Sequence, residues 1–568
     1  MGQARKDGAG QAPRRGLLTR LAKDVRGNTL AIVGAALVPL TAMIGSGVDM
    51  SRAYMAKTRL QSACDAGALA GRRIMQNDTL TQNVIDEARR FFNFNFPQGL
   101  YGTEPFTAAV TRPASGTVRM TAATNVPTAI MGMFGVENMP INVTCDASLN
   151  FVNTDVMLVL DVTGSMAESL GGTSKIVSLR DAVMALYDEL SPIQTQLTAN
   201  GMRLRYGVVP YSATVNVGAL IRGVNADYLV NSAAYQSRQP EYQLTNITQA
   251  QCSNYDNWSW RRTGGRNSTV GTCTYTSESG SQGGTWTGNF QHDEIIHDTS
   301  RFKTGASTPD PTRRPGTTSN TTWAGCIEER QTVSTITASS GYTIPATAYD
   351  LDINRIPDSD ATRWRPLWPQ VAYRRSSTTE EMFDEGDSNN RQTSAACPAA
   401  ARRLDVWTRT QLQTYVNALQ PTGNTYHDIG MIWGARMIST GGIFADGCET
   451  YGGMPCSRHV IFMTDGELAP STSVYSAYGQ EPLDQRITGS SSSSGQYDRH
   501  LQRFRMICNA TKGMNVSVWV IAFGTTLTTD MRDCASNPNQ ASTSSNRAEL
   551  MARFRQIGSQ IGALRLTQ

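Results

Sequence analysis

Three oxygen-bearing side chains follow a short apolar run. Residues Val156 to Leu160 are continuously apolar, and Asp161, Thr163 and Ser165 follow at alternate positions. An uninterrupted apolar run of this length is typical of a buried strand, and α/β sheets bind ligands at the carboxyl ends of their strands. A carboxylate and two hydroxyls are hard oxygen donors, which suit Mg²⁺ better than zinc. We therefore predict a cation site at this strand end.

Two later segments offer further oxygen donors. The segment GNTYHDIG places Thr425 and Asp428 at the start of an expected helix, and the apolar run HVIFM ends in Thr464-Asp465-Gly466. In a parallel sheet these segments converge at one edge. The expected metal ligands are Asp161, Thr163, Ser165, Thr425 and Asp465. Mg²⁺ is the expected ion, with Mn²⁺ or Ca²⁺ as alternatives, and one coordination position stays open for an acidic group of a protein partner.

A simpler interpretation of the same residues needs no metal. Asp161 and Asp465 could cap helices and turns at the strand ends, and Asp428 could interact with the dipole of its helix. Glu168 and Glu467 are nearby acids of the kind that solvent usually covers.

The residues around these motifs alternate between strand and helix patterns. Strands are expected at 203–218, where the strand leads into a loop, and at 459–467 and 516–524, and helices at 175–190, 425–439, 497–513 and 547–568. This alternation predicts an α/β fold with a doubly wound parallel sheet over residues 151–568. Residues 219–420 interrupt it. They are rich in Ser, Thr, Gly, Asn, Arg and Trp and show little helical periodicity, so we expect an irregular inserted region at the surface.

The N-terminal part of the chain has the sequence pattern of a membrane anchor. Seven basic and two acidic residues stand among the first 26, and residues 29–48 carry no charge. Twenty helical residues span about 30 Å, the thickness of a bilayer core. We expect a basic cytoplasmic head at 1–27 and a transmembrane helix at 28–50, with the body outside the inner membrane, periplasmic or extracellular. A secretory signal peptide is the alternative, although its apolar region is usually shorter.

Residues 51–150 have the layout of a small pilin-like α+β region. The helical pattern continues beyond the apolar span, and 83–96 is a second helical candidate. Residues 117–127 and 141–151 alternate as strands do.

The ten cysteines indicate an oxidising compartment. No pair has CxxC spacing, which argues against structural zinc, and an even count in an exported chain favours disulfides. The sequence does not fix their connectivity. Proximity suggests the pairs Cys448–Cys456 and Cys508–Cys534, and Cys64–Cys145 is the only pair available inside the first domain. The other four cysteines would staple the inserted region. Buried free thiols are the alternative.

Several functions find no support in the sequence. The basic head accounts for the net charge of +4, and the rest of the chain is close to neutral, so no nucleic-acid-binding surface is indicated. No GxxxxGK[ST] phosphate loop is present, and Ser165 does not lie in a GxSxG motif. His292 and His297, in HDEIIHD, lack the spacing of zinc proteases. We therefore expect a binding protein rather than an enzyme; an envelope hydrolase that uses the insert is the weakest alternative.

The oxygen motifs resemble a known family. The order DVTGS, a distant threonine and a TDG aspartate is similar to the metal-ion-dependent adhesion site of von Willebrand factor A domains, over roughly 153–220 and 420–568. The resemblance implies that Thr163 and Ser165 contact the metal through hydroxyls and that Thr425 does so in one of two states. It implies direct or water-mediated contacts for Asp161 and Asp465. Thr163 replaces the commoner serine and keeps the hydroxyl.

The N-terminal segment has a resemblance of its own. Residues 26–71, RGNTLAIVGAALVPLTAMIGSGVDMSRAYMAKTRLQSACDAGALAG, are similar to the start of TadE/TadG-like proteins of the Tad (tight adherence, Flp pilus) assembly system. An anchor of this kind joined to an A domain is the TadG-type arrangement. It implies a role in pilus assembly or adhesion, with other pilus-assembly or envelope proteins as partners. A metal-independent scaffold with a vestigial metal site is the alternative.

Overall fold

The computed structural model describes residues 25–75, 79–113, 117–148, 152–199, 201–448, 451 and 456–562, with 25–31 by backbone alone. The expected cytoplasmic head lies almost wholly outside these residues. The chain divides into two compact units, with the boundary between residues 150 and 151. Both contain helices and strands, so the mixed α/β class is confirmed, as is the apolar helix near the N-terminus.

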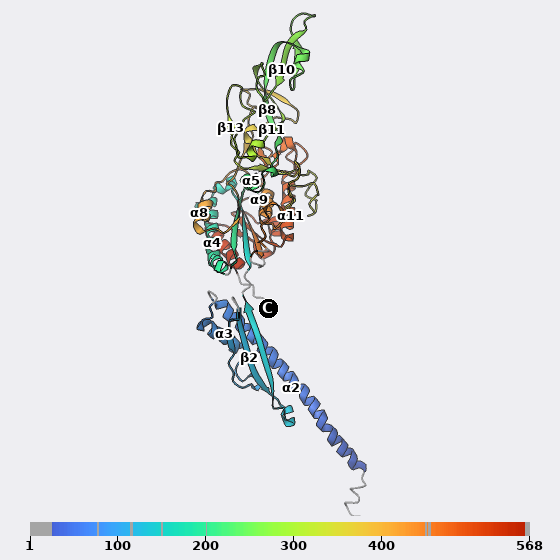
Figure 1. Ribbon diagram of the computed structural model, residues 1–568, viewed down its shortest axis with the longest axis vertical. Coiled ribbons are helices and arrows are strands. Elements are labelled where there is room, and N and C mark those ends of the chain that lie inside the picture. The colour runs from blue at the N-terminus through green and yellow to red at the C-terminus, as the bar shows by residue number, and fades with distance from the viewer. Residues whose placement is uncertain are drawn as a thin grey trace, which may run out of the picture. The chain divides into compact units, whose positions relative to one another are not determined.

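The first unit is built on one long helix, α2 (Val25–Ile74). It runs from the apolar span into the polar segment without a break (Figure 1), as the continuing helical pattern predicts. Its apolar part is long enough and uncharged enough to cross a membrane, a property shared by membrane anchors and signal sequences.

A second helix and a small sheet cover the polar half of α2. The sheet is antiparallel, in the order β1-β2-β3, and its alternating side chains bury Val118, Met120 and Ala122 against the helices. The disulfide Cys64–Cys145 ties α2 to β3. The elements are α3 (Gln82–Asn95), β1 (Ala109–Thr111), β2 (Thr117–Pro127), β3 (Asn138–Ser148), and the short helices η1 (Leu100–Gly102) and η2 (Met131–Phe134).

The second unit is organised around a six-stranded sheet in the order β18-β7-β4-β19-β22-β23. The pairs from β7 to β23 are parallel, and β18 joins β7 antiparallel at one edge. Elsewhere in the described residues the only parallel pair of strands is β17 with β20, and the other strand pairs are antiparallel. The strands are β4 (Asn153–Asp161), β7 (Leu204–Tyr211), β18 (Arg402–Asp405), β19 (Cys456–Thr464), β22 (Val516–Phe523) and β23 (Ala541–Ser544).

Helices pack on both faces of this sheet, which explains the continuous apolar run in β4. Val156, Leu158 and Leu160 pack in a core with α4, α8 and α13, whereas Met157 and Val159 pack in a second core with α9, α11 and α12. A strand covered on both faces needs apolar residues at every position. The helices are α4 (Lys175–Ala199), α8 (Arg409–Asn417), α9 (His427–Ile438), α11 (Gln496–Gly513), α12 (Thr529–Cys534) and α13 (Arg547–Gly562).

The inserted region is more regular than expected. It contains a five-stranded antiparallel sheet in the order β16-β11-β8-β10-β9, and β8, β10 and β11 form an arm that projects beyond the flanking helices (Figure 1). The prediction of an irregular region is therefore wrong for this arm. Polar residues on both faces of its strands hide the alternation that marks a half-buried strand. The strands are β8 (Ser232–Thr248), β9 (Ser259–Arg262), β10 (Val270–Thr276), β11 (Thr285–Asp298) and β16 (Glu381–Asp384).

The end of the inserted region also differs from the expectation. Residues 402–417, assigned to the insert by composition, form β18 and α8, which belong to the main sheet and one of its cores. The shorter elements of this unit are η3 (Gly164–Ala167), β5 (Ser169–Leu170), β6 (Thr173–Ser174), α5 (Gly218–Val224), η4 (Ala226–Tyr228), α6 (Gln249–Cys252), α7 (Ser300–Lys303), β12 (Thr308–Pro309), β13 (Asn320–Thr321), β14 (Ile327–Glu328), β15 (Arg365–Pro366), η5 (Pro369–Val371), β17 (Ser394–Ala395), η6 (Gly442–Phe444), β20 (Val474–Ser476), β21 (Gly479–Gln480), α10 (Glu481–Asp484) and η8 (Pro538–Gln540).

All ten cysteines are paired. The three disulfides suggested by the sequence, Cys64–Cys145, Cys448–Cys456 and Cys508–Cys534, are confirmed. The inserted region holds the other two, Cys252–Cys273 and Cys326–Cys397. The alternative of buried free thiols is therefore wrong.

Candidate metal centre

Asp161 is fixed at the carboxyl end of β4 and is fully buried. Its Oδ1 accepts the backbone N–H of Thr163 at 2.9 Å, and its Oδ2 accepts the Thr464 hydroxyl at 2.7 Å. Thr464 ends the neighbouring strand β19. The parallel pairing of β4 with β19 thus brings together motifs separated by some 300 residues.

Four other oxygens form a continuous series of contacts beside Asp161. The Thr425 hydroxyl lies 3.2 Å from that of Thr163, which lies 3.1 Å from that of Ser165. The Ser165 hydroxyl lies 2.8 Å from Oδ1 of Asp465. The structure thus gathers all five predicted ligands at one edge of the sheet.

These distances fit a small divalent cation. Mg²⁺ binds oxygen ligands octahedrally at about 2.0–2.1 Å, so neighbouring ligand oxygens lie about 2.9 Å apart. The observed separations of 2.8–3.2 Å span this value. The donors are carboxylate and hydroxyl oxygens, as a hard cation requires. The residues therefore fit Mg²⁺ in number, chemistry and spacing.

The charges at the site are unbalanced. Burial, together with the nearby charge of Asp465, raises the pKa of Asp161 to about 6. The ammonium of Lys175 lies 2.9 Å from Oδ2 of Asp465 and 2.9 Å from Glu168. Glu168 is exposed, whereas Lys175 and Asp465 are buried. One ammonium thus offsets part of two buried carboxylates, and Asp465 keeps its Oδ1 directed at the hydroxyls.

Two of the nearby acids stand apart from the donor set. Asp428 is buried and pairs with Nδ1 of His500 at 2.7 Å, so its role is to bind α9 to α11. Glu467 is exposed at the rim. Sequence reasoning missed Lys175 and Thr464, although Lys175 opens the predicted helix 175–190 and Thr464 precedes Asp465 directly.

The rim of the site is open to solvent. Gly164, Glu168 and Glu467 are exposed, and Ser165 is partly exposed. The inserted region reaches the neighbourhood at Ala396, which lies against Gly423. A pocket of about 310 Å³ begins just after Gly466 and is lined by Leu468, Ala469, Pro470, Ser471, Thr472, Ser493, Gln496 and Tyr497.

The two histidines of the insert do not form a shared site. His292 lies between the Arg374 carbonyl and Asn390. His297 lies 2.7 Å from the Ser237 hydroxyl and 2.5 Å from the Glu278 carboxylate. This order of groups matches that of a hydrolase triad, but Ser237 is only 1% exposed. A nucleophile closed off from solvent does not meet a substrate, so the group is structural.

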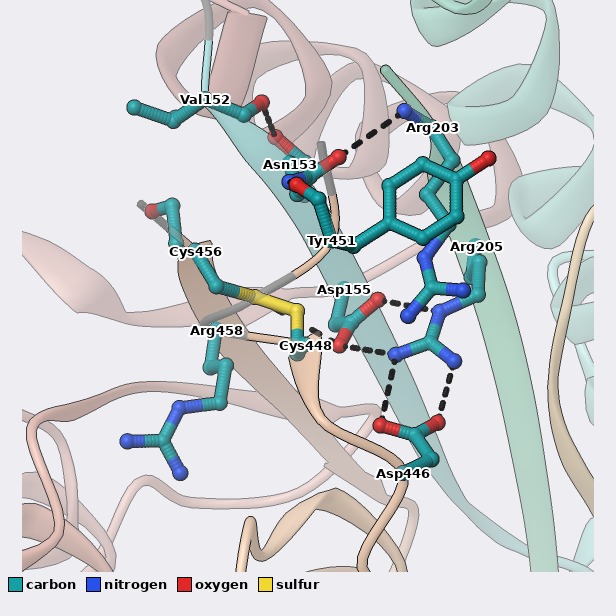
Figure 2. The surroundings of a disulfide bond; sticks show 12 residues. Val152, Asn153, Asp155, Arg203, Arg205, Asp446, Cys448, Tyr451, Cys456 and Arg458 are labelled. Carbon is teal, nitrogen blue, oxygen red and sulfur yellow. Dashed lines mark hydrogen bonds and ion pairs between the residues drawn. A yellow bond between two sulfur atoms is a disulfide. The ribbon is translucent and has the colours of Figure 1, made fainter. Parts of the chain in front are cut away.

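A group of possible metal ligands at the amino-terminal ends of the strands contains a disulfide instead (Figure 2). Asp155, Cys448 and Cys456 have ligand atoms close together, but the two sulfurs are bonded to each other. Asp155 instead accepts two hydrogen bonds from Arg205, at 2.8 and 2.6 Å, and Arg205 also contacts Asp446.

Comparison with known proteins supports the N-terminal resemblance. Residues 27–76 match the family described as "Putative Flp pilus-assembly TadE/G-like". No curated protein matches the chain.

Solved structures with some similarity to the chain include pilus proteins. The pilus adhesin SpaC from Lactobacillus rhamnosus GG matches 80% of this chain at 10% identity, with a TM-score of 0.29, and the chain spans about a third (34%) of that protein. The vWF domain of the type V pili tip protein Mfa5 from Porphyromonas gingivalis matches 72% of this chain and 95% of its own length, at 10% identity and a TM-score of 0.29. The adhesive tip pilin GBS104 from Group B Streptococcus agalactiae matches 72% of this chain and 100% of its own length, at 8% identity and a TM-score of 0.30. TM-scores this low do not establish a common fold.

Proposed function

We propose that this chain is a membrane-anchored protein of pilus assembly or adhesion, and not an enzyme. Its second unit is a von Willebrand A-type domain with a doubly wound sheet, and it binds a divalent cation, preferably Mg²⁺. Through that cation it binds an acidic group of a protein partner. The TadE/G-like match at residues 27–76 supports the place of the chain in pilus assembly.

The series of oxygen contacts from Thr425 to Asp465 is the observation that carries the metal proposal. Three hydroxyls and a carboxylate contact one another at the spacing of neighbouring octahedral ligands. A second buried carboxylate, that of Asp161, lies beside them. Most side-chain hydrogen bonds in proteins go to backbone or water rather than to other side chains. Here three hydroxyls turn toward one another, as a shared cation would require.

The topology supports the same assignment. Thr163 and Ser165 follow β4, Asp465 follows β19, and Thr425 precedes α9, which packs on β4. All lie at the carboxyl edge of parallel strands, where α/β sheets bind ligands.

The open rim supports recognition of a partner. A bound Mg²⁺ would supply a Lewis-acidic position for a carboxylate. Gly164 and the partly exposed Ser165 leave that face accessible. The adjoining pocket at Leu468–Tyr497 would take an apolar or polar side chain next to the partner's acidic group.

Calorimetric titration of Mg²⁺ into the full chain in detergent tests the metal proposal. Wild type should release or absorb heat with saturation at one ion per chain, and Ser165→Ala should weaken binding by about tenfold or more, since one ligand is lost. The Glu467→Gln variant is the matched control: it removes an exposed charge at the rim, outside the donor set, and should bind nearly as wild type does.

Absence of saturable binding by wild type would overturn the metal proposal. The metal-independent scaffold would then be the better account, and partner capture should be unchanged by EDTA. Weaker binding by Glu467→Gln together with unchanged binding by Ser165→Ala would show that negative charge alone attracts the ion.

A further inference from the structure

We propose that the turn between β2 and β3 dips into the outer leaflet of the membrane beside α2, as a second contact between the first unit and lipid. The turn comprises residues 128–136, with the sequence TAIMGMFGV and no charged residue. The inference rests on the membrane anchoring proposed above and adds a lipid-binding surface to it.

The turn is tied to a defined level of the helix. Asp49, in the first polar position after the apolar span, accepts three backbone N–H groups of the turn. Those of Ala129, Ile130 and Met131 lie at 2.7, 2.9 and 2.8 Å from its carboxylate. Asp49 is 2% exposed, so the backbone of the turn, rather than water, provides the hydrogen bonds to its carboxylate.

The turn also packs closely against α2 at Gly45, one helical turn before Asp49. A side chain at Gly45 would place its Cβ 2.3 Å from a methyl of Ile130. Only glycine allows this approach. The turn therefore lies against residues 45–49, where the apolar span ends, and Figure 1 shows the β2–β3 hairpin ending alongside α2.

The tip of the turn presents large apolar side chains to the outside. Met133 is 77% exposed, Phe134 40% and Val136 42%. The neighbouring helix surface is similar, with Met43 and Ile44 also exposed. The turn thus presents clustered apolar side chains at a level where the helix surface is apolar as well, and clustered exposed apolar surface marks contact with a membrane or a protein.

The position along the helix favours lipid as the occupant. Residues 29–48 match the thickness of a bilayer core at 1.5 Å per residue, so residues 45–49 lie at its outer boundary. Apolar side chains that lie flat at this boundary bury about 5–10 Å into the headgroup and acyl region. Tyr54, which is exposed just above, suits the interface.

Fluorescence quenching by spin-labelled lipid tests this proposal. The ten native cysteines are all in disulfides, so Met133→Cys adds a single reactive thiol that can carry bimane. The full chain is reconstituted into vesicles of phosphatidylethanolamine and phosphatidylglycerol containing 5-doxyl-phosphatidylcholine. The matched control is Phe94→Cys, which labels an exposed apolar position (83%) in α3, well beyond the turn.

Bimane at position 133 should be quenched severalfold more than bimane at position 94. Val136→Cys should behave like Met133→Cys, which provides a second variant should the first fold poorly. Equal quenching at 133 and 94, in chains that float with the vesicles, would overturn the inference and leave the anchor intact. Chains that do not float with the vesicles would instead overturn the anchoring on which it rests.

Discussion

At the scale of single residues, the candidate site combines oxygen donors that can be recognised in the sequence with the ammonium of Lys175, which cannot. Residue type and spacing are enough to predict Thr163, Ser165 and Asp465 as donors. Lys175 cannot be predicted in this way, because nothing in the local sequence relates the first residue of a helix to an aspartate 290 positions later. Its ammonium both orients Asp465 and competes for its charge.

Replacing Lys175 by methionine should tighten Mg²⁺ binding by about tenfold. Repulsion between an ammonium and a divalent ion a few Å apart amounts to ~1–2 kcal/mol even when water screens it well. Calorimetry on the full chain measures the change. Lys303→Met, at an ion pair with Asp227 in the insert, is the control and should leave affinity unchanged. Weaker binding by Lys175→Met would mean that orientation of Asp465 outweighs repulsion.

His292 should make folding stability depend on pH. Burial is the main cause that lowers its pKa, aided by the charge of Arg238, while hydrogen bonds to Arg374 and Asn390 and the charge of Glu381 oppose it. Below the ordinary value of 6.5 the unfolded chain therefore binds a proton that the folded chain does not, and stability falls as pH falls.

The variant His292→Gln should lose less stability than wild type between pH 7.5 and pH 5.5. Thermal unfolding at the two pH values measures the difference, and the other titrating groups, common to both proteins, cancel. A pH dependence identical to that of wild type would show that His292 is protonated as easily in the folded chain as in the unfolded one.

At the scale of elements, the two ends of the parallel strands have different tasks. The carboxyl ends carry the oxygen donors. The amino ends are closed by the Cys448–Cys456 disulfide and by the buried pair of Asp155 on β4 with Arg205 on β7 (Figure 2). Burial raises the pKa of Asp155, and Arg205 opposes this effect. The charged form of the carboxylate is therefore stabilised by Arg205.

Removing that partner should destabilise the second unit strongly. Arg205→Met leaves Asp155 buried beside an apolar side chain, and an orphaned buried charge costs about 3–5 kcal/mol. Urea unfolding of the full chain measures the loss. The double variant Asp155→Asn with Arg205→Met should recover much of it.

An exposed ion pair supplies the contrast. Arg409 and Asp188 are about half exposed, and Arg409→Met should cost under ~1 kcal/mol. Similar losses for Arg205→Met and Arg409→Met would contradict the importance assigned to burial.

At the scale of the whole molecule, the proposed topology rests on the apolar helix and the five disulfides. The basic head precedes the apolar span, and every disulfide follows it. Disulfides persist where the surroundings oxidise thiols, and basic flanks stay in the cytoplasm.

A reporter that needs an oxidising compartment, fused after residue 150, should therefore be active, and a reporter that needs the cytoplasm should be inactive at the same point. Alkaline phosphatase and green fluorescent protein fusions measure the two states. Fusions before residue 28 should give the reverse pattern. Cytoplasmic activity after residue 150 would contradict both the orientation and the placement of the disulfides in an oxidising compartment.

Local sequence patterns determined a large share of the elements. Apolar periodicity gave the bounds of α3, α11 and β2 to within one residue, since helices and strands with one or two covered faces must follow the period of their backbone. It failed for the arm of the insert. There the strands β8 and β11 are polar on both faces, and their pairing across some 50 residues holds them together.

The sequence by itself determined the kinds of oxygen donors and the long N-terminal helix, and it suggested three of the five disulfides. These depend on residue type, on helical period or on proximity along the chain. Only the tertiary structure decided which acids join the donors. In the folded chain Asp428 pairs with His500 and Lys175 pairs with Asp465. The Thr425 hydroxyl lies 3.2 Å from that of Thr163. Such contacts join residues that are distant in the chain, and packing of the sheet against its helices fixes them, so no local pattern encodes them.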